Sequence, residues 1–174
     1  MKKIASMIIV LAVALGMAAC KQQEQKNPVT YAPAAPSPLA IEQLQKAART
    51  SPKNPQAWTE LGNVLMDSQR FSEAIEAYQK ALALDPKNVD VRVDLGTCYR
   101  GIGRSDKAVE EYRKALTINP NHLNGHRNLG VVLVNDLHKT EEGVKEFKKY
   151  LELAPNAPDA GQLRQTIQEL SARK

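Results

Sequence analysis

The chain has 174 residues, of which 43% are hydrophobic, 25% charged and 5% aromatic. This length suits about one domain and excludes a large multidomain enzyme, while the composition excludes both a membrane bundle and a wholly disordered chain. The formal net charge of +5 raises the question of a nucleic acid or an anionic membrane surface as a partner. Two cysteines are too few for a metal site built from cysteines.

The first nineteen residues have the order of a secretory signal. Lys2 and Lys3 precede an apolar run over residues 4–15, and small residues follow up to Cys20. This arrangement is typical of a cleaved signal peptide. The apolar stretch over residues 4–19 is shorter than the roughly 20 residues of a membrane-spanning helix, which disfavours a transmembrane anchor. Residues 1–19 are therefore predicted to be a signal peptide.

The end of this signal resembles a bacterial lipobox, because residues 17–19, Met-Ala-Ala, precede Cys20. Leucine is commoner than methionine at the first of these positions. The resemblance implies cleavage before Cys20 and acylation of its sulfur and new amine, with chains such as palmitate. Lys21, where aspartate would signal retention in the inner membrane, implies the periplasmic face of the outer membrane of a two-membrane bacterium. An ordinary signal peptide, cut after Ala14 or Ala19, is the alternative.

Residues 20–38 form the predicted tether between Cys20 and the rest of the chain. After the cysteine, glutamine, lysine and four prolines leave almost nothing to bury. Such a segment cannot offset its ordering entropy, so the sequence predicts a disordered, partly polyproline II tether. Its reach is roughly 20 to 25 Å as a flexible chain and at most about 55 Å when stretched.

The remaining residues, 39–174, repeat at an interval of 34 residues. A leucine-glycine pair, two small residues flanking an aromatic ring, and a proline return in each copy. In the third copy the later positions are displaced by one, which predicts a one-residue insertion between Leu133 and Gly143. The recurring residues are Leu61, Gly62, Ala74, Tyr78, Ala81 and Pro86; Leu95, Gly96, Ala108, Tyr112, Ala115 and Pro120; and Leu129, Gly130, Gly143, Phe147, Tyr150 and Pro155.

Each recurring residue type has a physical reason. Glycine within a helix costs about 1 kcal/mol relative to alanine, so its return implies that two helices pack closely there. The small-aromatic-small positions fall on one helical face, and the prolines end the second helices. The pattern predicts helix pairs at 55–68 and 72–84, 89–102 and 105–118, and 123–137 and 140–153. Ser72, Ser105 and Thr140 are the predicted N-caps of the second helices.

Two further helices flank these pairs. Residues 38–50 are in phase with a second helix, because Ala40, Leu44 and Ala47 match the small-aromatic-small positions. Residues 158–172 read as a helix with one apolar face, and Pro158 suits its first turn. A stack of repeats needs a terminal helix of this kind, with a polar outer face, to cover its last interface.

The repeat resembles the tetratricopeptide repeat (TPR) in Trp58-x2-Leu61-Gly62-x2-Leu65 and in Ala74-x3-Tyr78-x2-Ala81 before Pro86. The resemblance covers residues 55–156. It implies an all-α fold: an α-solenoid of three TPR helix pairs, at about 55–88, 89–122 and 123–157, with an N-terminal half-repeat helix and a C-terminal capping helix.

The same resemblance implies a concave groove, lined mainly by the first helices, that binds a peptide or a helix of a protein partner. Carried over position by position, the groove residues are Gln56, Thr59, Asn63, Met66, Asp90, Val93, Thr97, Arg100, Asn124, Arg127, Val131 and Val134. Heat-shock co-chaperones of this family bind acidic tails through a carboxylate clamp. Its positions here are Thr59, Asn63, Asp94, Asn124 and Asn128, of which only Asn63 agrees, so an acidic tail is not the expected partner.

Catalytic and metal-binding motifs find no support. His122 and His126 are four residues apart, but the segment lacks the glutamate of a zinc protease motif and a third ligand. Packing or a surface role is expected for both, and neither a metal nor a cofactor is predicted. Cys98 lies between Leu95 and Tyr99 in a predicted helix and is expected to be a small buried hydrophobe, with a reactive thiol as the alternative.

The net positive charge becomes smaller once the predicted signal peptide is set apart from the rest of the chain. Cleavage would remove Lys2 and Lys3 and leave 22 basic and 19 acidic residues, a formal net charge of +3. The remaining charges are interspersed along the predicted helices, which is typical of a solvated face. Nucleic acid is therefore not an expected partner.

The sequence favours a non-enzymatic, membrane-anchored protein–protein interaction scaffold of the bacterial envelope. Its partners would be envelope proteins rather than small-molecule substrates. The alternative is an accessory or regulatory factor of a periplasmic enzyme or of a cytochrome c maturation system. A third possibility is self-association through the end helices.

Overall fold

The computed structural model describes residues 37–172, which contain helices and no strand. The elements are α1 (Pro38–Thr50), α2 (Pro55–Asp67), α3 (Phe71–Leu84), α4 (Val89–Gly101), α5 (Ser105–Ile118), α6 (Leu123–Val131), the π-helical segment η1 (Val132–Asp136), α7 (Thr140–Leu153) and α8 (Ala160–Ala172). This confirms the predicted all-α solenoid. The predicted signal peptide, the lipidation site at Cys20 and the tether up to residue 36 lie outside the described residues.

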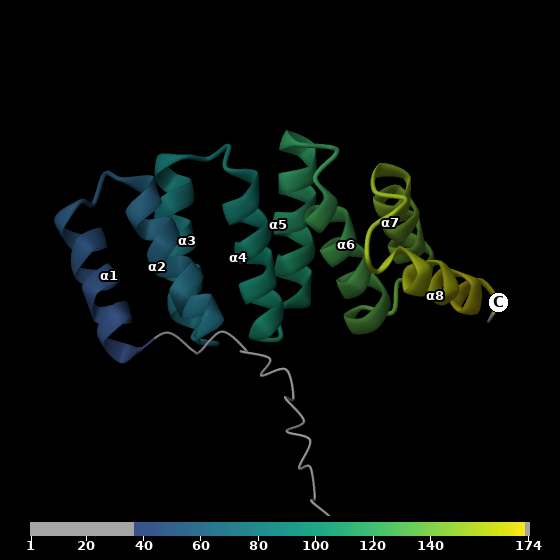
Figure 1. Cartoon of the computed structure of the whole chain (residues 1–174), viewed down its shortest axis with the longest axis horizontal. Coiled ribbons are helices and arrows are strands. Elements are labelled where there is room, and N and C mark those ends of the chain that lie inside the picture. The colour runs from purple at the N-terminus through teal and green to yellow at the C-terminus, as the bar shows by residue number, and fades with distance from the viewer. Residues whose placement is uncertain (1–36, 173–174) are drawn as a thin grey trace, which may run out of the picture. The chain divides into compact units, whose positions relative to one another are not determined.

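Consecutive helices pack against one another in a row (Figure 1). The three helix pairs are α2 with α3, α4 with α5, and α6–η1 with α7; α1 packs on α2, and α8 packs on α7. The first helices also contact each other directly, α2 with α4 and α4 with α6, whereas the second helices of this described part make no comparable contact. The first helices therefore lie on the inner side of the row, and we call the surface they share the groove face.

Each helix pair is held together by a ring packed on a glycine. The pairs are Gly62 with Tyr78, Gly96 with Tyr112, and Gly130 with Phe147. A Cβ atom added at these glycines would lie 2.5, 2.6 and 2.5 Å, respectively, from a carbon of the ring. Since such contacts are too close for any side chain, glycine is the residue that lets the two helices approach, as the sequence predicted.

The turns inside the first two helix pairs are Schellman motifs. After α2, the N–H of Gln69 donates to the carbonyl of Met66 and the N–H of Arg70 to that of Leu65, both at 2.8 Å. Gln69 has φ +58°, and the equivalent residue after α4 is Gly103 at φ +75°. These two hydrogen bonds satisfy carbonyls at the end of the first helix, so only residues 68–70 and 102–104 connect the helices of these two pairs.

The predicted N-caps of the second helices are wrong. Ser105 and Thr140 are the first residues of α5 and α7, and Ser72 is the second residue of α3. The N-cap residues are Arg70, Arg104 and Lys139, none of which makes a side-chain capping bond. The reason is the tightness of the turn: in the first two pairs, the last residue of the Schellman motif is already the N-cap of the next helix.

The predicted insertion in the third copy forms the π-helical segment η1. The N–H of Leu137 donates to the carbonyl of Val132, five residues earlier, at 3.1 Å. A π-helical turn holds one residue more than an α-helical turn, so the extra residue is absorbed without breaking the helix. The α-helix that was predicted to reach residue 137 therefore ends at Val131.

Helix α8 begins at Ala160, two residues later than predicted, so Pro158 precedes the helix instead of starting it. Ala160 and Ile167 are buried, and Leu163 and Leu170 are half-buried. The apolar face of α8 therefore covers the end of the row, as a capping helix should. None of the described helices combines the length and the apolar character needed to cross a membrane.

Candidate binding groove

Most of the predicted groove residues are at least partly accessible on the first helices, but Val93 is not. Its side chain is only 3% exposed and belongs to the core. The equivalent residues of the other copies, Thr59 and Arg127, are half-buried and exposed, respectively. The apolar valine packs between the helices at this position, so Val93 stabilises the row and cannot contact a partner.

In each helix pair, the residue after the packed glycine is chemically matched to the aromatic ring that packs on that glycine. The hydroxyl of Tyr78 donates to Oδ1 of Asn63 at 2.8 Å, and the hydroxyls of Tyr112 and Thr97 lie 3.1 Å apart. In the third copy the ring belongs to a phenylalanine, which has no hydroxyl, and the residue after the glycine is Val131. Asn63 and Thr97 therefore support the helix pair as well as facing the groove, a role that sequence reasoning missed.

This pairing predicts that a substitution at position 78 restores stability lost by a substitution at position 63. Asn63→Val should destabilise the protein by about 1 to 2 kcal/mol, because it leaves the fully buried Tyr78 without its oxygen acceptor. Adding Tyr78→Phe recreates the combination of the third copy and should restore most of the loss. Urea denaturation of the two single variants and the double variant measures the coupling. Additive losses would show that the two side chains act independently.

Polar contacts join the groove face from one repeat to the next. Nε2 of His122 lies 2.8 Å from Oδ1 of Asp90, while Nδ1 of His122 accepts from the N–H of Gly125 and caps α6. Oγ1 of Thr97 lies 3.5 Å from the amide of Asn128. His122 thus links α4 to α6 and serves the fold rather than a metal.

The two arginines of the groove face are also paired with carboxylates 36 and 32 residues further along the chain. Arg100 donates from Nε and Nη2 to the Asp136 carboxylate at 2.8 and 3.1 Å, and Arg127 donates from Nε to Asp159 at 2.6 Å. Asp159 also accepts from the hydroxyl of Tyr150 at 2.7 Å. Both guanidinium groups therefore have carboxylate partners within the chain before any ligand binds.

A cavity of about 250 Å³ lies at the α8 end of the groove face. Both apolar and polar side chains line it. The lining residues are Arg127, Val131, Val134, Asn135, Phe147, Asp159, Gln162, Leu163 and Thr166. The structure thus brings three predicted groove residues, Arg127, Val131 and Val134, to one hollow together with residues of α7 and α8, which sequence reasoning did not assign to the site.

The middle of the groove face carries a carboxylate in an unfavourable position. Asp94 is half-buried, and no hydrogen bond or ion pair to it is found among the described residues. Burial, together with the nearby carboxylates of Asp90 and Asp67, raises the pKa of Asp94 to about 6, although His122 acts in the opposite direction. The ionised form is therefore less stable here than in water.

Asp94→Asn should consequently stabilise the protein at neutral pH. Because the native pKa lies above the ordinary value of 3.8, the native state binds more protons than the unfolded state between about pH 4 and 6, and the unfavourable contribution develops as pH rises through that window. We expect a gain of roughly 1 to 2 kcal/mol at pH 7 that vanishes below about pH 4. Thermal unfolding from pH 3.5 to 7.5 measures it; a gain of equal size at every pH would contradict this cause.

On the opposite face of the first helices, one position of each copy binds the proline carbonyl of the preceding turn. Trp58 Nε1 donates to Pro52, Arg92 Nη2 donates to Pro86, and His126 Nε2 lies 2.9 Å from the carbonyl of Pro120. Each of these side chains then meets the second helix of its own pair.

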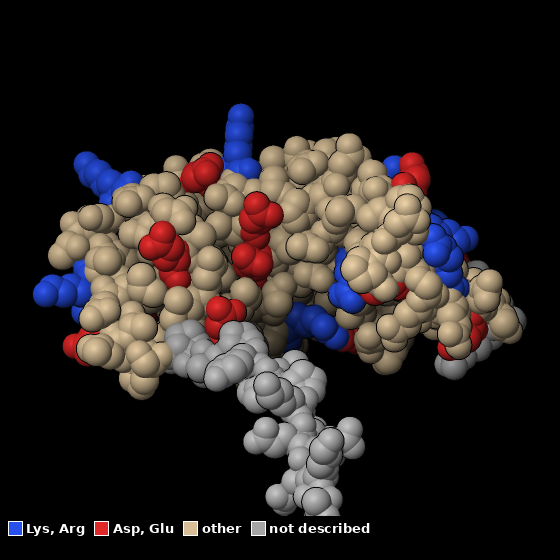
Figure 2. Space-filling model, viewed as in Figure 1, with Lys and Arg blue, Asp and Glu red and all other residues tan. Residues whose placement is uncertain are grey.

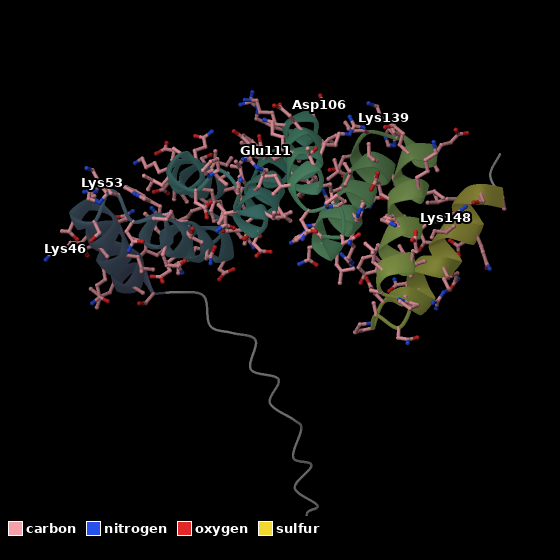
Figure 3. All side chains as sticks on the ribbon, turned by 90° about the horizontal axis from the view of Figure 1, so that it is seen from above. Lys46, Lys53, Asp106, Glu111, Lys139 and Lys148 are labelled. Atoms are coloured by element: carbon pink, nitrogen blue, oxygen red, sulfur yellow. The ribbon has the colours of Figure 1, made fainter. Side chains whose placement is uncertain are left out.

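The contacts with the second helices are a cation–π contact from Lys80 to Trp58, an ion pair of Arg92 with Glu111, and a contact of 2.7 Å between Nδ1 of His126 and Oε2 of Glu146. Figure 3 shows Glu111 in the middle of the row. Both ring nitrogens of His126 are therefore occupied by the fold. No group of three His, Cys, Asp or Glu side chains between residues 37 and 172 could hold a metal ion.

Cys98 is fully buried and unpaired. Burial, reinforced by Asp94, raises the pKa of its thiol to about 12. Since the thiolate is the reactive form, the structure supports the expected role as a small core residue and disfavours a reactive thiol.

The comparisons with known proteins agree with this architecture. A family model described as a tetratricopeptide repeat matches residues 37–89 and 59–122. The chain belongs to the tetratricopeptide repeat family. A sequence comparison with curated proteins gives no match.

Solved TPR structures share the fold. A crystal structure of MamA has a TM-score of 0.70 at 22% identity, over 76% of this chain and 77% of that one. A second MamA structure has a TM-score of 0.61 at 32% identity, over 66% and 62%. The first TPR of Spaghetti (RPAP3), bound to the HSP90 peptide SRMEEVD, has a TM-score of 0.63 at 24% identity, over 68% and 93%. These solved structures therefore share the helical-repeat fold of the chain.

Proposed function

We propose that this TPR protein is a non-enzymatic, lipid-anchored scaffold of the bacterial envelope that binds a segment of a protein partner on its groove face. The observation that carries the proposal is the cavity of about 250 Å³ between α6, η1 and α8. It opens on the face where the first helices present exposed polar side chains such as Gln56 and Asn124. A TPR neighbour is described as binding a peptide, and a groove of helices suits an extended segment or a helix.

The anchor is proposed from the sequence alone. Cleavage before Cys20 and acylation of that residue would hold the protein at a membrane, because each buried methylene contributes about 0.8 kcal/mol. Lys21 favours the outer membrane, with the repeat domain on its periplasmic side. The partners would then be other proteins of the envelope, reached within the length of the tether that precedes α1.

The non-enzymatic part of the proposal rests on what the reactive side chains do. His122 caps α6 and contacts Asp90, His126 bridges Pro120 and Glu146, and Cys98 is buried. Each of these groups is engaged in the fold instead of facing a shared pocket. A scaffold needs no more chemistry than a shaped surface and a few exposed polar groups.

Chemical crosslinking followed by affinity purification from membranes tests this function. The variant Gln56→Trp/Asn124→Trp places bulky rings on the groove face at two exposed positions. The matched control, Glu76→Trp/Lys148→Trp, changes exposed residues of α3 and α7. We expect the groove variant to lose its crosslinked partner and the control to retain it. Equal recovery by both variants would contradict binding on the groove face.

A further inference from the structure

Within residues 37–172, the carboxylates on the α2 and α4 part of the groove face have no lysine or arginine partner. Helix α2 contains no lysine or arginine. In the described part of the chain, the side chain of Glu60 accepts from Gln56 of its own helix, at 3.2 Å, and that of Asp90 contacts His122 at 2.8 Å. No lysine or arginine of the described residues forms an ion pair with Glu60, Asp67, Asp90 or Asp94.

Several carboxylates of the second helices are paired instead. Glu73 pairs with Arg70, Glu111 with Arg92 and Lys114, Glu142 with Arg113, and Glu152 with Lys149. The two arginines of the groove face are themselves held by Asp136 and Asp159. Figure 2 shows acidic side chains in the middle of the surface over α2, α3 and α4, and basic ones only along its border. Among the residues that the structure describes, the carboxylates of α2 and α4 on the groove face are therefore not paired with a lysine or an arginine.

A cation that binds from solvent would interact favourably with these carboxylates. The side chain of Asp94 is half-buried and makes no hydrogen bond within the described residues, and its pKa is raised by burial and by Asp90 and Asp67. A positively charged group placed here would stabilise the ionised form. Because the described residues form no group of three that could hold a metal ion, an organic cation such as a lysine or arginine side chain fits better.

We propose that the groove face takes a basic segment of the partner, with lysine or arginine side chains against Asp67, Asp90 and Asp94 and an apolar side chain in the cavity between α6, η1 and α8. The inference rests on the proposed function and specifies its partner. It agrees with the poor match to the carboxylate clamp: where that clamp would hold an acidic tail, Asp94 would repel it. Complementary charge also speeds and orients association with such a segment.

Fluorescence anisotropy with labelled peptides tests the proposal on the full-length chain, purified in detergent. The basic probe is a ten-residue peptide with four lysines and one terminal leucine, and two matched probes replace the lysines with glutamate or with glutamine. We expect the basic probe to bind most tightly and to weaken as salt is raised from 50 to about 500 mM. Tighter binding of the acidic or the glutamine probe would overturn the charge assignment.

Variants that remove carboxylates test which of them bind the basic probe. Asp67→Asn/Asp94→Asn should weaken the basic probe about tenfold, while the matched control, Glu42→Gln/Glu76→Gln, should leave it within about twofold because these exposed carboxylates lie on α1 and α3. Equal weakening by both variants, or by neither, would overturn the proposal. If the acidic probe binds instead and Gln56→Trp/Asn124→Trp abolishes that binding, the proposed basic segment is wrong and the proposed groove function stands. If no probe binds and the tryptophan variant still crosslinks to the partner, the basic segment and the groove function are both wrong.

Discussion

Gly96→Leu is expected to destabilise the protein by about 3 kcal/mol or more. A Cβ atom at this position would lie 2.6 and 2.9 Å from two carbons of the Tyr112 ring, and leucine adds three further carbons. Tyr112 is 1% exposed and has no room to withdraw. Overpacking of this kind typically costs about 1 to 3 kcal/mol, and here it also separates α4 from α5. Urea denaturation monitored by circular dichroism measures the loss.

Gly161→Leu is the matched control for this prediction. Gly161 lies in α8, and a Cβ atom there would have no neighbour within 4 Å. The same substitution should therefore stabilise the protein slightly, by up to about 1 kcal/mol, through the higher helix propensity of leucine. If the two variants changed the free energy of unfolding equally, the glycine–ring contact would not be what holds the helix pair together.

Cys20→Ser should move the protein from the membrane fraction to the soluble fraction, or leave it unprocessed. Serine cannot form the thioether through which the lipid is attached, so the variant would lack the acyl chains that bind the bilayer. Fractionation, combined with mass spectrometry of the N-terminus, measures both localisation and modification. The proposal predicts a mass increase from acylation on the wild type and none on the variant.

Cys98→Ala provides the control, because Cys98 is fully buried and far along the chain from the cleavage site. This variant should remain acylated and membrane-bound, so the two cysteines separate an effect on lipidation from a general effect of losing a thiol. A cleaved, unmodified Cys20→Ser protein that still sedimented with membranes would contradict lipid anchoring.

The fold could be predicted from the sequence because its signals repeat. Gly62, Gly96 and Gly130 return at one interval, and each meets a ring from the following helix, as the helix pairing requires. The insertion in the third copy was predicted from the shift of its later positions, but the form it takes, a π-helical turn at residues 132–136, depends on how the helix keeps its packing on both sides.

The details of the turns and of the groove face were harder to predict. Ser72 and Ser105 are good capping residues in isolation, but the Schellman turn leaves no place for them. Val93 matches a groove position by phase, and only the packed structure turns it inward. Asp159 was missed because its partner Arg127 lies 32 residues earlier, and a contact across a whole repeat leaves no local pattern.

The central claim is that a partner occupies the groove face, and site-specific photocrosslinking in intact cells tests it most directly. A photoreactive amino acid would replace Asn124, which is exposed on α6 and makes no contact that the fold requires, or Glu76, which is exposed on α3. We predict that one defined envelope protein crosslinks from position 124 and not from position 76. Crosslinking to that protein from position 76 alone would place the binding surface on the second helices and contradict the claim.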